Sequence, residues 1–200
     1  MELDAERIIG LYERHADAWD KDRLKILFEK PWLDRFRNLV PAGGAILDLG
    51  CGSGEPLAGY FIAAGLRLTG ADSSRGMIAL CRERFPQHEW IVADMRRLAL
   101  GRRFDGILAW DSFFHLTHHD QRRMFPVFRA HAAPHAALMF TSGPAHGEAI
   151  GTYRGEPLYH ASLDEAEYLA LLESNGFAAV SHVANDPECD RRTVWLARLR

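Results

Sequence analysis

A glycine loop flanked by acidic residues carries the strongest chemical signal in the sequence. Residues 46–56 read ILDLGCGSGEP, an apolar stretch followed by glycines at alternate positions. Gly50 and Gly52 would let backbone N–H groups approach a ligand where a Cβ atom would clash. Asp48 and Glu55 bracket the loop, and two carboxylates beside a helix N-terminus would repel a pyrophosphate. The loop therefore predicts a site for a ligand that carries positive charge.

Two common nucleotide sites do not match this loop. A dinucleotide fingerprint, G-x-G-x-x-G, requires glycine three positions after Gly52, where this chain has Glu55. No G-K-[ST] sequence follows the loop, which excludes a nucleoside triphosphate site of that type. An NAD-dependent oxidoreductase is therefore disfavoured.

Two more aspartates stand where further strands are expected to end. Asp72 lies 22 positions after Gly50 (72 − 50 = 22), close to the ~20 expected of a carboxylate that binds ribose hydroxyls. Asp94, followed by Met95, ends the next strand pattern. A single aspartate at a strand end is common in turns. Three successive strands ending in aspartate beside a glycine loop indicate one shared ligand site.

The elements that must position these residues alternate between strands and helices. This alternation predicts an α/β fold, a doubly wound, seven-stranded and mostly parallel sheet with helices on both faces. A short polar loop between the last two strands predicts a C-terminal antiparallel hairpin strand at the sheet edge. We predict strands over 45–49, 67–71, 89–93, 104–110, 136–141, 177–184 and 193–199, and helices over 55–64, 74–84, 117 onward and 162–175.

The remaining segments are expected to cover the sheet. Residues 1–40 have a helical pattern up to a break at Lys30-Pro31 and are predicted to form an N-terminal helical lid. Residues 41–200 would form a Rossmann-like core, so 1–200 is expected to be a single domain. The segment 143–161 is too long and glycine-rich for a simple turn, and we expect a functional loop or flap there.

The composition is that of an ordinary globular protein. The 200 residues include 24 Lys+Arg and 27 Asp+Glu, so a net charge of −3 would not draw the protein to nucleic acid. No apolar run approaches the ~18 residues of a membrane helix, and the N-terminus does not read as a secretion signal. Three cysteines at unrelated spacings imply neither a disulfide framework nor a paired-cysteine zinc site. We expect a cytoplasmic protein with neither a membrane nor, on this charge pattern, a nucleic-acid partner.

Four segments resemble the motifs of the class I (Rossmann-like) S-adenosylmethionine-dependent methyltransferases. ILDLGCGSGEP is similar to the first motif of that family, GADSS to the second, VADMRRL to the third and FDGILAWDSFFHL to the fourth. The resemblance covers nearly the whole chain from about Tyr12. It implies S-adenosylmethionine as the cofactor but does not specify the acceptor.

The resemblance assigns a role to each motif. Asp48 and the glycine loop would hold the methionyl ammonium and carboxylate, and Asp72 both ribose hydroxyls. Asp94 and Met95 would contact the adenine, and Trp110-Asp111 would lie beside the methyl sulfonium. The full set of implied cofactor-binding residues is Tyr12, Trp19, Asp48, Gly50, Cys51, Gly52, Gly54, Asp72, Ser73, Met77, Asp94, Met95, Trp110 and Asp111.

The N-terminal aromatic residues have two interpretations. Tyr12 and Trp19-Asp20 resemble the family's Y-x(6)-[WY]-D lid helix, in which aromatic rings cover the cofactor and attract the sulfonium. Seven-residue spacing also places both rings on one helix face, where they would pack against a core. The spacing alone does not separate these alternatives.

A small organic molecule is the expected acceptor. No [NDS]-P-P-[FYW] sequence of amino-methylating nucleic-acid enzymes follows the fourth strand. Aromatic and polar side chains after strands four and five suit a small molecule, and we assign Phe113, Phe114, Tyr153 and His160 to its pocket. The alternative is a non-catalytic module that binds or senses S-adenosylmethionine.

His115 and His146 are the candidate catalytic bases, since methylation of an oxygen or protonated nitrogen requires loss of a proton. Either residue can instead be structural, and a glycine-flanked His146 can simply face solvent. No metal is predicted, because the adjacent His118 and His119 would point in different directions at a helix start. The acceptor's identity, the atom methylated and the oligomeric state stay open.

Overall fold

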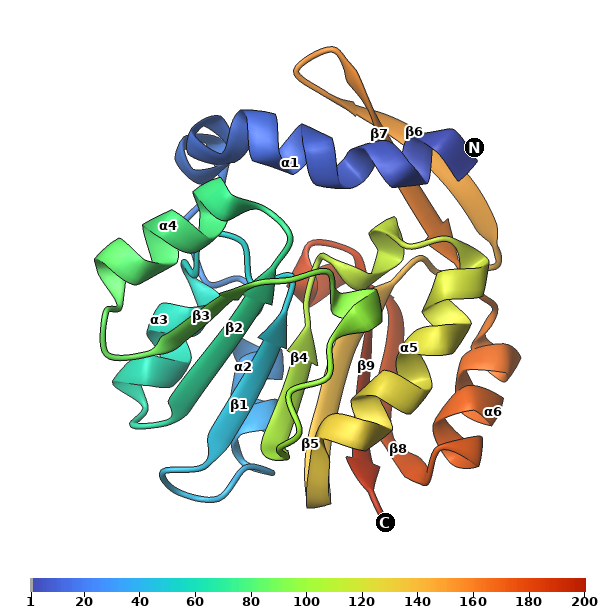
Figure 1. Ribbon diagram of the computed structural model, residues 1–200. Helices are drawn as coiled ribbons and strands as arrows, with labels where there is room; N and C mark the ends of the chain where they lie inside the picture. Colours follow the sequence, from blue (N-terminus) through green and yellow to red (C-terminus); the bar gives the residue numbers. More distant parts are fainter. Residues whose placement is uncertain (1) are drawn as a thin grey trace.

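The computed structural model describes residues 2–200, and side chains from residue 5 onward (Figure 1). Seven strands form one sheet in the order β3-β2-β1-β4-β5-β9-β8. All neighbouring pairs among β1–β5 are parallel, and β9 is antiparallel to both β5 and β8. This confirms the predicted sheet. Its strands are β1 (Ala45–Leu49), β2 (Arg67–Asp72), β3 (Glu89–Val92), β4 (Phe104–Ala109), β5 (Ala132–Ser142), β8 (Phe177–Asp186) and β9 (Arg192–Leu199).

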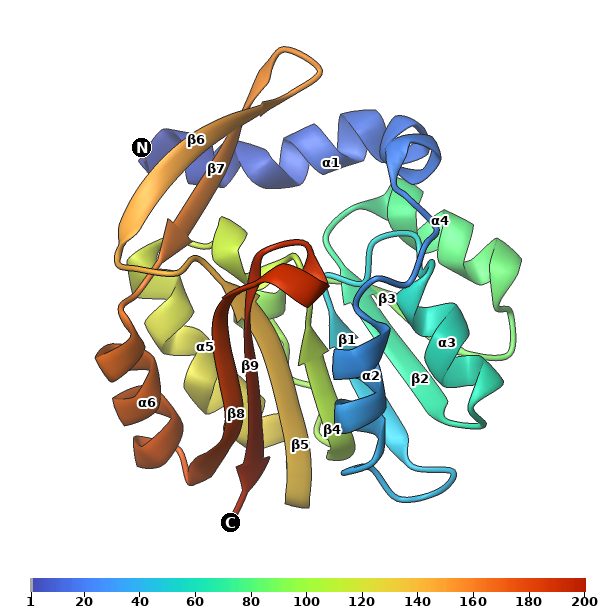
Figure 2. The ribbon, with the colours of Figure 1, turned by 180° about the vertical axis from the view of Figure 1, so that it is seen from behind.

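Helices cover both faces of this sheet. The α5 helix (His118–His131) and α6 (Glu165–Ser174) pack on one face, in a cluster that includes Phe125, Phe140 and Tyr168 (Figure 1). The helices α2 (Lys30–Arg37), α3 (Leu57–Ala63) and α4 (Arg75–Arg84) lie on the other face, where Phe36 and Phe61 are wholly buried (Figure 2). Because the central strands are covered on both sides, they are continuous apolar runs rather than alternating ones.

The segment after β5, where a functional loop or flap was expected, forms an antiparallel hairpin. Its strands β6 (Gly147–Tyr153) and β7 (Glu156–Ser162) pair only with each other. Figures 1 and 2 both show this hairpin rising beside α1 (Glu2–Asp22), above the edge of the sheet where β1 and β4 end. The hairpin and α1 together form a cover over that edge.

The N-terminal region differs from the prediction of a forty-residue lid. The α1 helix ends at Asp22, and Lys30-Pro31 begins α2 instead of ending a helix. Proline is tolerated in a first turn, because the N–H that it lacks has no partner within the helix there. Trp32, with the rest of the buried face of α2, belongs to the core cluster beneath β1. Only α1 is therefore placed to act as a lid.

Among residues 2–200, no helix has the length and apolar character needed to span a membrane.

Candidate functional site

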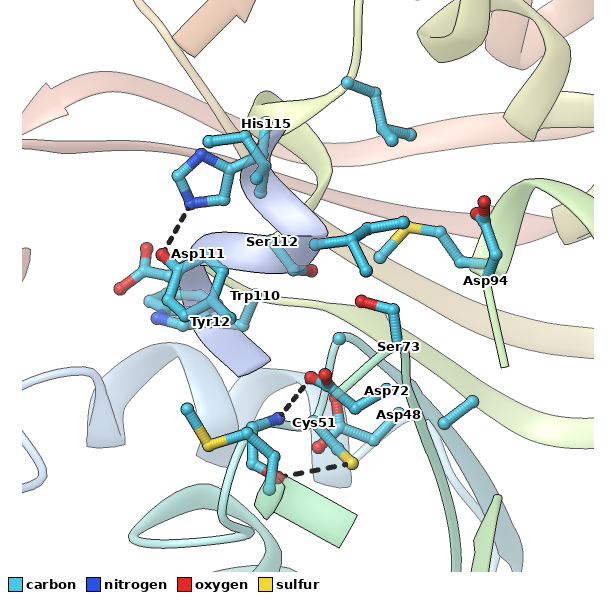
Figure 3. Close-up of a pocket in the computed structure, with 18 of the residues that line it drawn as sticks. Tyr12, Asp48, Cys51, Asp72, Ser73, Asp94, Trp110, Asp111, Ser112 and His115 are labelled. Carbon is cyan, nitrogen blue, oxygen red and sulfur yellow. Dashed lines mark hydrogen bonds between the residues drawn. The ribbon is translucent and has the colours of Figure 1, made fainter. Parts of the chain in front are cut away.

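One large cleft lies between the sheet edge and α1. It is open to solvent at its mouth, and its empty space together with the solvent at that mouth is about 1110 Å³. Its walls come from the loops that follow β1, β2, β3 and β4, from the start of α5 and from α1 (Figure 3). The cleft occupies the position at which open α/β sheets bind ligands, outside the carboxyl ends of the strands.

The glycine loop after β1 forms the floor of the cleft. Gly50 has φ of +72°, and a Cβ atom there would lie 2.3 Å from Cβ of Ser112. Glycine is therefore required at this position for both conformation and space. The N–H of Gly50 donates to the carbonyl of Ala71 at 2.7 Å, which ties the loop to the end of β2. The loop is preformed by backbone contacts.

Asp48 places a buried carboxylate at the end of β1. It is 4% exposed, and within residues 5–200, whose side chains are described, no group donates a hydrogen bond to its carboxylate. Burial, followed by the nearby charge of Asp72, raises the pKa of Asp48 to about 7, while Arg23 acts in the opposite direction. An unpaired buried carboxylate is stabilised by a cationic partner. This end of the cleft therefore favours a ligand with an ammonium group.

Asp72 shapes the loop and faces the cleft at the end of β2. One carboxylate oxygen accepts from Gly52 N–H at 2.9 Å and the other accepts from Ser74 N–H at 2.9 Å. Burial raises the pKa of Asp72 despite these hydrogen bonds. Each oxygen keeps a lone pair that can accept from a ligand hydroxyl. The side chain thus couples the shape of the glycine loop to a hydroxyl-binding position.

Asp94 lies in a different electrostatic setting at the far end of the cleft. Burial alone would raise its pKa, but hydrogen bonds from Arg96 outweigh this and hold the pKa below its ordinary value. Arg96 donates to both oxygens of Asp94 and, at 2.9 Å, to Asp120. Asp94 is therefore an ionised hydrogen-bond acceptor, and Met95 lies beside it in the wall.

Aromatic rings from α1 line the opposite side. Tyr12 and Trp19 pack edge to face with ring centroids 5.1 Å apart, and both border the cleft. Trp19 in turn contacts Tyr153 of the hairpin, with centroids 5.0 Å apart. Both α1 rings thus border the cleft, and Tyr12 also packs against the small apolar cluster of Ile8, Tyr159 and Ala161. This placement agrees with the lid interpretation.

A charged cluster closes the cleft after β4. Asp111 has φ of +47°, a region that residues other than glycine seldom occupy. Arg192 from β9 donates to both of its carboxylate oxygens at 3.0 Å, and Arg23 lies 3.8 Å away. Arg23 also pairs at 3.3 Å with Glu29, which is fully buried. These contacts from distant segments hold Asp111 in its unusual conformation.

The structure brings most of the predicted site together. All fourteen implied cofactor-binding residues border the cleft, and His115 does so as well. Phe114 and His160 stack near His115, with centroids 4.8 Å from Phe114 to His115 and 5.1 Å from Phe114 to His160. Tyr153 sits at the cover, where its hydroxyl donates to Asp22 at 2.9 Å.

Two predicted placements are wrong. Phe113 is 0% exposed and packs among Phe125, Phe128 and Phe140 in the core, so it does not reach an acceptor. His146 does not border the cleft, and its ring stacks on His118 with centroids 4.4 Å apart. A general base must come within hydrogen-bond reach of the proton that it removes, so His146 does not qualify.

Several cleft residues were missed from the sequence. Arg23 and Asp120 are charged wall residues outside the four motif segments, Arg96 lies in the third segment but was given no role, and Ile8 and Ile9 add an apolar patch from α1. The helical spacing of Ile8 with Tyr12 was visible in the sequence. The pairing of Arg23 with Asp111 joins residues 88 positions apart (111 − 23 = 88), and no local pattern indicates it.

One group of metal-ligating side chains gathers outside the cleft. Ligand atoms of His146, Asp164 and Glu167 lie within 4.8 Å of one another. Both carboxylate oxygens of Glu167 already accept from Arg122, and Asp164 caps α6 by accepting from Glu167 N–H. These groups have structural partners, so we assign no metal to them.

Comparisons with known proteins agree with this geometry. Residues 46–135 match the model of the methyltransferase domain. Trans-aconitate 2-methyltransferase of Variovorax paradoxus is 33% identical over 89 residues, which are 43% of this chain and 30% of the relative. A tRNA (carboxymethyluridine(34)-5-O)-methyltransferase, ALKBH8 of Mus musculus, is 29% identical over 96 residues, 47% of this chain and 13% of that protein. The chain thus matches less than a third of either relative's length.

A solved structure extends the likeness to nearly the whole chain. CalS10, an amino pentose methyltransferase from Micromonospora echinaspora solved with bound S-adenosylmethionine, superposes with a TM-score of 0.72. The match covers 94% of this chain and 96% of CalS10 at 19% identity, so it establishes the shared fold. The sheet order and the acidic strand ends around a glycine loop agree with these likenesses: residues 46–135 match a methyltransferase domain, and the chain has the fold of an S-adenosylmethionine-binding methyltransferase.

Proposed function

We propose that the protein transfers a methyl group to a small-molecule acceptor held between α1, the loop after β4 and the β6–β7 hairpin. The observation that carries this proposal is Asp48, a buried carboxylate without a hydrogen-bond donor and with a pKa raised to about 7 beside a preformed glycine loop. Such a group stabilises a bound ammonium, which the methionyl part of S-adenosylmethionine carries.

The residues around the cleft have separate tasks in this proposal. Asp72 accepts from the ribose hydroxyls, and Asp94 with Met95 binds the adenine. Tyr12 and Trp19 cover the ligand and exclude water. When bound, S-adenosylmethionine supplies an electrophilic methyl group on its own leaving group. The protein therefore needs to hold an acceptor in line, and Trp110-Asp111 at the end of β4 is placed to do so.

The cover over the site supports a small acceptor. The acceptor side is bounded by α1 and the hairpin, which are joined by side-chain contacts such as His15 to Glu156 at 2.6 Å. The Variovorax relative is named for trans-aconitate and CalS10 for an amino pentose, both small molecules. The mouse relative is named for a tRNA base, so a nucleic-acid acceptor is the competing outcome.

The first experiment measures the cofactor. Isothermal titration calorimetry with S-adenosylmethionine should give saturable binding to wild type and much weaker binding to Asp48→Asn. The matched control is Asp105→Asn, a carboxylate that accepts from Ala45 N–H at 2.8 Å at the other end of β1. Equal affinity in all three proteins would contradict the assignment of Asp48.

The second experiment measures turnover. S-adenosylhomocysteine release is followed with a panel of small carboxylic acids, amines and phenols, and with bulk tRNA. Release that requires a small molecule supports the proposal. Release with tRNA alone would assign a nucleic-acid acceptor. Tight binding of S-adenosylmethionine without release from any acceptor would favour the non-catalytic module.

Two further parts of the proposal concern the division of the chain into domains and the location of the protein in the cell. We propose that α1 and the core act as one domain, supported by Glu13 of α1, which accepts from Ser74 Oγ at 2.8 Å and Arg75 N–H at 2.7 Å at the start of α4. We also propose a cytoplasmic location, which the three free cysteines support.

A further inference from the structure

His115 joins three segments that surround the acceptor side of the cleft. It lies in the short helical turn η2 (Phe113–His115) and is 7% exposed. Its Nδ1 lies 2.7 Å from the carbonyl oxygen of Tyr159 on β7. Its Nε2 lies 2.9 Å from the hydroxyl of Tyr12 on α1, as Figure 3 shows. Both ring nitrogens are therefore engaged by the two elements that cover the cleft.

These two partners determine which nitrogen carries the hydrogen. A carbonyl oxygen only accepts, so Nδ1–H must donate to Tyr159. In a neutral imidazole the other nitrogen then holds a lone pair, and Nε2 accepts from the Tyr12 hydroxyl. The Tyr12 hydrogen consequently points at His115. The lone pairs of the Tyr12 oxygen that remain are free to accept elsewhere.

The surroundings disfavour a charged ring. His160 of β7 is the titratable side chain whose ring lies tilted against His115, with ring centroids 4.8 Å apart, and a second imidazole offers no negative charge. Asp72, Asp111 and Arg23 act on Tyr12 of α1, and no carboxylate among the side chains described, residues 5–200, accepts a hydrogen bond from His115. Burial lowers the pKa of His115 to about 3.

We propose that His115 is a positioning residue rather than the general base: it stays neutral and aims the Tyr12 oxygen, as an acceptor, at the reaction centre. This inference rests on the proposed function. It implies that an acceptor proton does not end on His115. An amine acceptor satisfies this requirement, because its nitrogen lone pair forms the new N–CH₃ bond as the S–CH₃ bond breaks, and the extra proton then leaves the N-methylammonium for water.

The first test needs no acceptor. Nitrogen-15 spectra of the histidine rings are recorded between about pH 5 and pH 9, the range in which ordinary histidines titrate. His115 is assigned by comparison with His115→Asn. The expected result is a neutral ring with hydrogen on Nδ1 across the whole range. A midpoint inside that range would overturn the inference, whatever the outcome for methyl transfer.

The protein contains a matched reference for this spectrum. His131 is also buried, with Nδ1 2.9 Å from the Val127 carbonyl and Nε2 accepting from Leu100 N–H at 3.1 Å. It should show the same hydrogen position as His115, although it lies outside the cleft. The exposed His119 supplies a solvent-facing reference in the same sample.

The second test uses turnover with the acceptor found above. Gln at position 115 can still offer an oxygen to the Tyr12 hydroxyl, whereas Ala cannot. His115→Gln should retain activity within about tenfold of wild type, and His115→Ala should lose about 10- to 100-fold, mostly in kcat. In His115→Gln, kcat/KM should still fall at low pH as it does in wild type, and this fall is the acid limb of the pH profile. Loss of that limb, with equal loss of activity in both variants, would identify His115 as the base.

Discussion

The two sides of the cleft are held together by different kinds of contact. The proposed cofactor side is part of the main sheet, where backbone groups hold the glycine loop and Asp48 and Asp72 border the cleft. The proposed acceptor side is formed by α1 and the β6–β7 hairpin, which are joined by exposed side chains. Glu156 pairs there with Arg14 and His15, and Asp22 pairs with Arg154 at 2.8 Å.

This difference separates a preformed site from an adjustable one. Backbone hydrogen bonds within a packed sheet open rarely, because their opening exposes buried apolar surface. Exposed ion pairs contribute little net stability and are screened by salt. The cofactor side can thus keep one geometry while the cover moves to admit different molecules. The following experiments test whether the two sides differ in this way.

The largest effect is expected for Asp72→Ala. The variant loses the acceptor that supports Gly52 and Ser74 N–H groups together with the proposed ribose acceptor. Hydrogen bonds to a charged group contribute about 1.5–3 kcal/mol each, so S-adenosylmethionine should bind roughly 100-fold more weakly or worse. Calorimetry measures the affinity, and Asp105→Ala is the control that should lose stability but keep affinity. Wild-type affinity in Asp72→Ala would show that this side is not organised around that carboxylate.

The next effect concerns pH and Asp48. Its folded-state pKa is raised from 3.8 to about 7, so the folded protein holds a proton that the unfolded chain releases. The stabilisation is fully present below the unfolded pKa near 3.8 and is lost as pH rises through about 7. The ligand-free protein should therefore lose up to about 4 kcal/mol of unfolding free energy across that window. Urea denaturation at a series of pH values measures this slope.

Binding should change with pH in the opposite direction. An ammonium pairs with the ionised carboxylate, so S-adenosylmethionine should bind more tightly as pH rises through about 7, with release of a proton. Calorimetry in two buffers with different ionisation enthalpies measures the released proton. Asp48→Asn supplies the control, since it should flatten the stability slope and abolish the proton release. A slope that survives in this variant would assign the titration to another group.

The contrast between the two sides also explains how far the sequence could be interpreted. Asp48, Asp72 and Asp94 lie at or within two residues of the ends of β1, β2 and β3, so local patterns were enough to predict that they border one cleft. The strand at 147–153 contains two glycines and exposed residues, which weaken an alternating pattern. The hairpin was consequently predicted as a loop.

The wrong predictions for single residues have a similar cause. Phe113 and Phe114 are adjacent, yet only Phe113 turns into the core, because η2 rotates successive side chains to different sides. His146 was assigned to the site from its loop alone, whereas its ring stacks on α5. The pairing of Arg192 with Asp111 joins residues 81 positions apart. Such contacts depend on the tertiary fold, which residue spacing does not encode.

The smallest effect is expected for the cover itself. Glu156→Gln removes the ionic contacts of the hairpin with Arg14 and His15. Hydrogen exchange of the backbone amides of 147–162 should accelerate roughly two- to fivefold, while amides of the glycine loop and the affinity for S-adenosylmethionine stay unchanged. Added salt should reproduce the effect in wild type, because it screens the same charges. The matched control is Glu89→Gln, which breaks an exposed pair with Arg102 at the β3 edge. Unchanged exchange in Glu156→Gln would mean that apolar contacts of Ile8 with Tyr159 hold the cover, and the two sides would then be equally fixed.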